Sequence, residues 1–229
     1  MRIGRILGIV LGLAAAPGCT GSLFQSKAVA PAVYLLSANL AAPAPPVELP
    51  ARVSADLAVQ RPRVRAGLNT DRIAVLYPDR RLDYFAGARW SGPIDEVLQD
   101  LAVQGFRTAA HLRNVNADAS AFASGYWLEI EVLDFQAEYS GALAAPMIHV
   151  HLLARLGNAG DRRIIDTVDV SAHEPALGNR LTPIVDAYER ATDAALSDLV
   201  KEVARSLAVS LEHAGAGGVG QAVTPVGAR

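Results

Sequence analysis

The sequence predicts a single α/β (α+β) domain, in which a mixed β-sheet carries two main helices packed on one face. Alternation of apolar and polar residues, the pattern of strands, marks two groups of segments within 53–85 and 126–171. Apolar residues three and four positions apart, the pattern of amphipathic helices, follow each group at 91–105 and 182–213. The order strands, helix, strands, helix therefore favours one sheet covered by both helices.

Three short strands are expected in the first group. Residues 53–59 alternate and end before Arg61-Pro62-Arg63, because proline has no N–H to donate to a strand ladder. Residues 72–77 and 82–85 follow, each after a turn-like segment. A shorter strand-like run, 33–36, stands upstream between segments rich in Ala, Pro, Ser and Gly.

The first helix is expected to begin with Ser91 as its N-cap and to end at Gly105. Serine is a common N-cap residue, and Pro93 falls in the first turn, where its missing N–H does no harm. Glycine commonly ends helices because it adopts the left-handed conformation readily. The apolar residues at helical spacing are Ile94, Val97, Leu98 and Leu101.

The second group of strands centres on 126–138, in which alternate residues are apolar. The apolar positions change phase near Val132, so we expect a β-bulge there. Residues 147–156 form the expected hairpin partner, and 163–171 form a further strand across a turn rich in Gly and Asn. At about 1.5 Å per residue, the helix over 182–213 is long enough for one end to extend past the sheet.

Residues 1–18 have the features of a secretory signal peptide. Two arginines form a basic start, and the apolar run 6–16 is too short to span a bilayer, which needs about 20 residues. The segment Ala16-Pro17-Gly18-Cys19 resembles the lipobox of bacterial lipoproteins. The alternative is an ordinary signal peptide cleaved near Ala16, which would leave Cys19 as a free thiol.

Cys19 is the only cysteine, so the exported protein can form no internal disulfide. The lipobox resemblance implies that Cys19 is the lipid-attachment residue, carrying a diacylglyceryl group and an N-acyl chain such as palmitate. Two or more acyl chains anchor a protein stably to a membrane. In such lipoproteins the next residue influences sorting, and Thr20 in place of aspartate points to the outer membrane, with the protein facing the periplasm.

These features divide the chain into four parts. They are the signal peptide over 1–18, a lipidated N-terminus with tether and first short strand over 19–51, the folded domain over 52–213, and a Gly- and Ala-rich tail over 214–229 that we expect to be disordered. Removal of the signal peptide takes two arginines away, so the formal net charge changes from −2 to −4. A chain without a basic patch is not suited to binding nucleic acid.

Two histidines of one predicted strand, His149 and His151, share a face because they lie two residues apart, and they could ligate a metal ion. A third ligand is not obvious, since the other histidines fall in different elements. These are His111, His173 and His213. We therefore interpret the pair as solvent-facing strand residues and expect no metal and no cofactor.

Glu129 and Glu131 similarly share a strand face with Trp127, and paired carboxylates can perform acid–base chemistry. On an exposed sheet face, however, carboxylates usually serve solvation. The glycines of the tail do not stand between a strand and a helix, as a dinucleotide-binding loop requires, and no nucleophile motif is present. We expect no catalytic residue, and hence no enzyme.

Trp90 precedes the expected helix start, where it can either pack between sheet and helix or contact a partner. Core packing is the interpretation we favour, because tryptophan usually buries most of its area. Arginine and tryptophan are also enriched among the residues that dominate binding interfaces. Arg89, Trp90 and Trp127 are therefore the candidates for a partner interface.

Several segments together resemble the ABC-type transport auxiliary lipoprotein family (PqiC-like). They are, in order, the lipobox, a Tyr-Leu-Leu strand, Leu57-Ala58-Val59 with Pro62, the strand 71–75, Leu82-Asp83-Tyr84-Phe85, Ala88-Arg89-Trp90-Ser91 with Pro93 and its helix, and the strand 126–138 with its hairpin partner. Their order and spacing, which cover most of residues 33–210, carry the resemblance.

The resemblance implies a non-catalytic periplasmic lipoprotein subunit of an MCE-type (mammalian cell entry) ABC transport system, which moves phospholipids or related hydrophobic molecules between the inner and outer membranes. The implied partners are an MCE-domain protein and further copies of the chain in a homo-oligomeric ring. The alternative is a lipid-binding carrier lipoprotein. An internal apolar pocket of roughly a few hundred Å³ would favour the carrier, and a filled core with an exposed apolar edge would favour the subunit.

Overall fold

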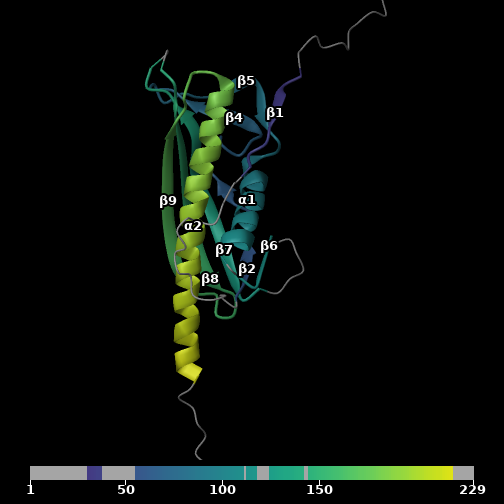
Figure 1. Cartoon of the computed structure of the whole chain (residues 1–229), viewed down its shortest axis with the longest axis vertical. Coiled ribbons are helices and arrows are strands. Elements are labelled where there is room, and N and C mark those ends of the chain that lie inside the picture. The colour runs from purple at the N-terminus through teal and green to yellow at the C-terminus, as the bar shows by residue number, and fades with distance from the viewer. Residues whose placement is uncertain (1–29, 38–54, 111, 118–123, 142–143, 219–229) are drawn as a thin grey trace, which may run out of the picture. The chain divides into compact units, whose positions relative to one another are not determined.

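The computed structural model describes residues 30–37, 55–110, 112–117, 124–141 and 144–218, which form a nine-stranded mixed sheet and two helices (Figure 1). The predicted signal peptide, Cys19 and most of the predicted tether lie outside the described residues. The strands are β1 (Ala32–Tyr34), β2 (Asp56–Val59), β3 (Arg63–Val64), β4 (Arg72–Leu76), β5 (Leu82–Trp90), β6 (Asn114–Ala117), β7 (Tyr126–Glu138), β8 (Met147–Asn158) and β9 (Ile164–Pro175). The helices are α1 (Ile94–Ala109) and α2 (Leu181–Gly218).

The long strand β7 organises the sheet. Along one edge it pairs in succession with three short parallel strands, β2, β3 and β4, and along the other edge it pairs with antiparallel β8 over its whole length. Beyond β8 the sheet continues with antiparallel β9. Beyond β4 it continues with β5 and then β1, and beyond β2 with β6.

Both helices cover the same face of this sheet (Figure 1). Helix α1 packs on β2, β3 and β6, helix α2 packs on β8 and β9, and the two helices contact each other. Three buried aromatic rings meet in this layer: Trp90 at the end of β5, Phe135 of β7 and Tyr188 of α2. The architecture confirms the predicted fold class, a single α/β domain with a mixed sheet.

The central hairpin follows the prediction closely. Strand β7 has the predicted bounds, and its pairing with β8 shifts register between Val132 and Asp134, which confirms the predicted bulge. Before the shift the even-numbered residues from Tyr126 to Val132 are buried, and after it Phe135 and Ala137 are buried.

Helix α1 differs from the prediction at both ends. Pro93, not Ser91, is the N-cap residue, and no side chain caps the helix, so the assignment of Ser91 was wrong. Gly105 was also wrongly assigned as the end, since the helix continues to Ala109. The extra turn places the Phe106 side chain in the core, where it is fully buried. Packing against the sheet therefore outweighs the tendency of glycine to end a helix.

Strand β5 is longer than the predicted 82–85, because it runs on to Trp90. Residues 86–90, which follow the predicted strand, are part of it as well. In the structure Gly87 has a φ of 69°, a value that glycine tolerates, and the chain continues as a strand. The backbone N–H of Trp90 donates to the Asp71 carbonyl at 2.6 Å, and β1 pairs with the last residues of β5.

The remaining differences concern short or terminal segments. Strands β3 and β6 were not predicted, and β9 extends to Pro175 rather than to 171. Helix α2 continues to Gly218, past the expected start of the tail, and extends beyond the sheet (Figure 1). Residues 219–229 lie outside the described residues. Within the described chain, no helix combines the length and apolar character needed to cross a membrane.

Candidate functional site

The face of β7, β8 and β9 that points away from the helices carries two clusters of polar side chains. At one end of it, Glu129 binds Arg63 at 2.8 Å, and Arg155 lies 3.7 Å from both Glu129 and Glu131. The two glutamates that the sequence placed beside Trp127 are therefore paired with arginines. Their side chains are partly exposed, 22% for Glu129 and 34% for Glu131.

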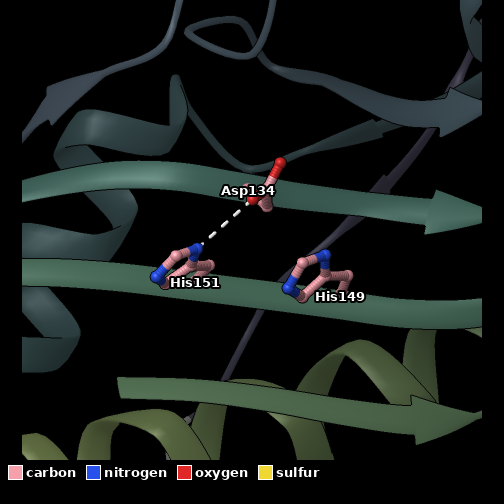
Figure 2. Close-up of side chains that lie close together, drawn as sticks. All are labelled: Asp134, His149 and His151. Atoms are coloured by element: carbon pink, nitrogen blue, oxygen red, sulfur yellow. Dashed lines mark ion pairs between the residues drawn. The ribbon is translucent and has the colours of Figure 1, made fainter. Parts of the chain in front are cut away.

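A second cluster lies past the bulge, where Asp134 of β7 faces His149 and His151 of β8 (Figure 2). One oxygen of Asp134 and one nitrogen of each histidine lie within 4.8 Å of one another. Asp134 pairs with His151 across the two strands, and its Oδ2 lies 3.4 Å from His151 Nδ1. The prediction that both histidines share one strand face agrees with this geometry.

The other oxygen of the Asp134 carboxylate, Oδ1, accepts two hydrogen bonds. Arg65 donates to Asp134 Oδ1 at 3.1 Å and the Gln136 amide donates to it at 3.0 Å. Partial burial raises the pKa of Asp134, but the hydrogen bond from Gln136 and the neighbouring His149 and Arg65 outweigh this effect, so the pKa lies below its ordinary value. The carboxylate form is therefore favoured.

Both histidines have further polar partners. His151 Nε2 lies 2.7 Å from Asp169 Oδ1 of β9. The two ring nitrogens of His149 lie 3.1 Å from Glu138 Oε1 and 3.2 Å from Ser171 Oγ. Every ring nitrogen of the pair thus faces an oxygen.

Sequence reasoning missed two members of this neighbourhood. Asp134 was not considered, because the search for a third ligand was limited to histidine and cysteine, although the change of phase near Val132 places residue 134 on the outer face. His173 was assigned to a separate element, but it lies opposite His149 on β9, with the ring centroids 4.0 Å apart. His213 lies at the far end of α2, and His111 is outside the described residues.

The three partner-interface candidates occupy different environments. Trp90 is 1% exposed and packs against Phe135 and Tyr188, so it has the core position that we favoured and its side chain is not available to a partner. Arg89 points outward, with 47% of its side chain exposed and a 3.6 Å ion pair to Asp71. It lines a groove of about 520 Å³.

Trp127 is partly buried on the outer sheet face, directly opposite Gly157 of β8. Its indole covers that glycine, since a Cβ built on Gly157 would stand 2.1 Å from the ring. The missing side chain of Gly157 therefore makes room for the tryptophan.

We expect Gly157→Ala to lower the free energy of unfolding by about 1–3 kcal/mol, because the new methyl group displaces the Trp127 ring. Urea denaturation of Gly157→Ala, Trp127→Ala and the double variant would measure the change in the free energy of unfolding. In a Trp127→Ala background the clash is gone, so Gly157→Ala should be neutral or stabilise by up to about 1 kcal/mol. Equal destabilisation in both backgrounds would contradict the contact.

A groove of about 900 Å³ lies between the start of β9 and the last turns of α2. Its lining mixes exposed apolar side chains, Ile164 and Val209, with the charged side chains of Asp161, Arg163 and Arg205. The groove opens at one end of the layer between sheet and α2, since its lining also includes Tyr126 of β7 and Ser206 of α2.

Comparison with known protein families is decisive for the identity of the domain. The family model described as "ABC-type transport auxiliary lipoprotein component" matches residues 34–208, which include β2 to β9, all of α1 and most of α2. The chain belongs to this family. The sequence resemblance is thereby confirmed, and the protein is an auxiliary lipoprotein component of a transport system.

Solved structures share the fold of this auxiliary lipoprotein. Protein XCC0632 from Xanthomonas campestris is 23% identical, with a TM-score of 0.71, over 79% of this chain and 99% of that chain. A crystal structure of an uncharacterized protein is 13% identical, with a TM-score of 0.58, over 76% of this chain and 99% of that chain. A search of curated proteins finds no significant match.

Proposed function

We propose that this auxiliary lipoprotein is a non-catalytic scaffold subunit of an MCE-type ABC transport system. In this proposal Cys19 anchors it to the outer membrane, its domain faces the periplasm, and it binds an MCE-domain protein and copies of itself in a ring. The transported molecules are phospholipids or related hydrophobic molecules. Family membership supports the transport role, and the resemblance noted in the sequence supports the MCE partner.

The dense packing around Trp90, in the layer between sheet and helices, is the observation that favours a scaffold over a lipid carrier. Trp90, Phe135 and Tyr188 pack there with ring centroids 5.1–6.2 Å apart, and the Tyr188 hydroxyl donates to the Ala74 carbonyl at 2.8 Å. Burial raises the pKa of Tyr188 well above its ordinary value, which accords with a dry environment. A carrier instead needs an apolar cavity large enough for acyl chains.

An exposed apolar edge beside Arg89 suits a partner-binding surface. Among the described strands, β1 pairs with β5 alone, and its Val33 lies opposite Arg89. Val33 is 50% exposed and Leu35 is 72% exposed, although both are apolar. Apolar residues next to an arginine and an unpaired strand edge are features that binding partners cover.

The proposal is tested with the full lipoprotein, purified in detergent with its anchor in place. We expect it to self-associate in size-exclusion chromatography, to retain the MCE-domain protein of its own system in a pull-down, and to carry no stoichiometric phospholipid in extracts analysed by mass spectrometry. A monomer that binds no MCE protein and retains one phospholipid per chain through detergent exchange would instead support the carrier.

Arg89→Ala should weaken binding to the MCE protein, or self-association, by about 1–2 kcal/mol if Arg89 lies in the centre of an interface. Titration by surface plasmon resonance or analytical ultracentrifugation measures this change. Arg163→Ala is a matched control, since Arg163 is also an exposed arginine, with a 3.9 Å ion pair to Asp161 in the turn before β9. Equal losses in both variants would indicate a general charge effect and contradict the assigned surface.

A further inference from the structure

We propose that Asp134, His149 and His151 bind a divalent transition-metal ion of the Zn²⁺ type on the outer face of the sheet (Figure 2). The site is independent of the scaffold role, and the family description does not assign it. The sequence alone favoured solvent-facing histidines because a third ligand was not apparent. Asp134 supplies that ligand.

The donor set selects the class of ion. Two imidazole nitrogens and one carboxylate oxygen suit zinc and its neighbours among the transition metals, whereas Mg²⁺ and Ca²⁺ prefer oxygen ligands alone. In a tetrahedral zinc site with bonds of about 2.0–2.1 Å, neighbouring ligand atoms stand about 3.3 Å apart. The three donor atoms lie within 4.8 Å of one another, so modest rotation of the side chains brings them to that spacing. Three protein ligands leave a fourth position open towards solvent.

The β-bulge of β7 is what brings the carboxylate to the histidines. Residue 134 has the same parity as the buried residues Leu128, Ile130 and Val132, so in a regular strand Asp134 would point into the core. The register shift between Val132 and Asp134 turns its side chain outward, opposite His151. Bulges often re-aim a side chain at functional sites.

The surrounding groups match the outer shell of a metal site. Histidines that bind metals commonly donate their second ring N–H to a carboxylate or another oxygen, and ligating carboxylates are themselves hydrogen-bonded. His151 has Asp169 in that position. The two nitrogens of His149 face Glu138 and Ser171, so one of these oxygens gives way to the metal and the other holds the second nitrogen. For Asp134, Arg65 and Gln136 occupy Oδ1, while Oδ2 faces His151.

Local charge also favours a cation. Three carboxylates, those of Asp134, Glu138 and Asp169, contact the two imidazoles, and the guanidinium of Arg65 offsets only one of them. With neutral imidazoles, as metal binding requires, the cluster keeps an excess of negative charge. A divalent cation would neutralise this excess.

The test is isothermal titration of the full lipoprotein in detergent with zinc chloride, after treatment with a chelator. We expect saturable binding of one Zn²⁺ per chain. Addition of Mg²⁺ at about 1 mM should not change this binding. Asp134→Asn should weaken the affinity at least about tenfold, and His149→Gln combined with His151→Gln should abolish the binding. Circular dichroism and thermal melting of the metal-free variants would establish that they fold.

Two matched controls make the outcome specific. Glu129→Gln removes a carboxylate from the same strand face, and His213→Gln removes a histidine from the end of α2; both variants should bind zinc like the parent. Cobalt substitution should give visible absorption bands that are lost with the double histidine variant. Absence of saturable binding, or equal weakening by Glu129→Gln and Asp134→Asn, would overturn the assignment.

Discussion

Replacement of Trp90 by alanine is expected to lower the free energy of unfolding by about 3–5 kcal/mol, the usual range for a buried aromatic side chain. The indole is 1% exposed and contacts both Phe135 and Tyr188. Its removal therefore leaves a cavity between the end of β5 and helix α2. Domains of this size are stable by about 5–15 kcal/mol in total. The variant should therefore unfold at a much lower urea concentration, as followed by circular dichroism.

Trp90→Phe keeps the measurement possible if the alanine variant does not fold. Phenylalanine retains most of the aromatic contact and removes the indole N–H, which is buried without a hydrogen-bond partner among the described residues. The loss should therefore be smaller, about 1–2 kcal/mol. Trp127→Ala is the matched control, because that tryptophan is only partly buried on the outer face. A loss for Trp90→Ala no greater than that for Trp127→Ala would disprove the central role of Trp90.

The central hairpin could be predicted from the sequence because its signal is local. Alternation over 126–138 requires only that one strand face be buried, and the change of phase near Val132 requires only a bulge. The ends of α1 could not be predicted in this way. Gly105 and Ser91 have local preferences for helix ends, but the burial of Phe106 depends on a sheet assembled from distant strands.

The same distinction applies to the candidate sites. The sequence places His149 and His151 on one face of a strand, because that depends on spacing alone. Their contacts with Asp134 and with His173 depend on the registers of β7 with β8 and of β8 with β9, which are not local properties. The pairing of Trp127 with Gly157 arises in the same way. A single sequence therefore predicts which residues share a strand face. The register between neighbouring strands decides which of those side chains come into contact.

Cys19→Ser is the change expected to have the largest effect on localisation. In the proposed lipoprotein each buried methylene of the acyl chains contributes about 0.8 kcal/mol to membrane binding, so two or three chains hold the protein firmly. Serine cannot take the thioether-linked diacylglyceryl group, and the variant should lose this anchor as a whole.

Membrane fractionation of cells producing the parent and the variant measures this effect. The parent should sediment with outer membranes, and Cys19→Ser should be recovered from the periplasmic fraction with its domain intact. Thr20→Asp is the matched control for sorting, because it keeps the acylated cysteine but places aspartate after it, and it should stay membrane-bound while moving towards the inner membrane. If parent and Cys19→Ser fractionate alike, the alternative of an ordinary signal peptide cleaved near Ala16 would be favoured, and the thiol of Cys19 should then react with a maleimide in the exported parent.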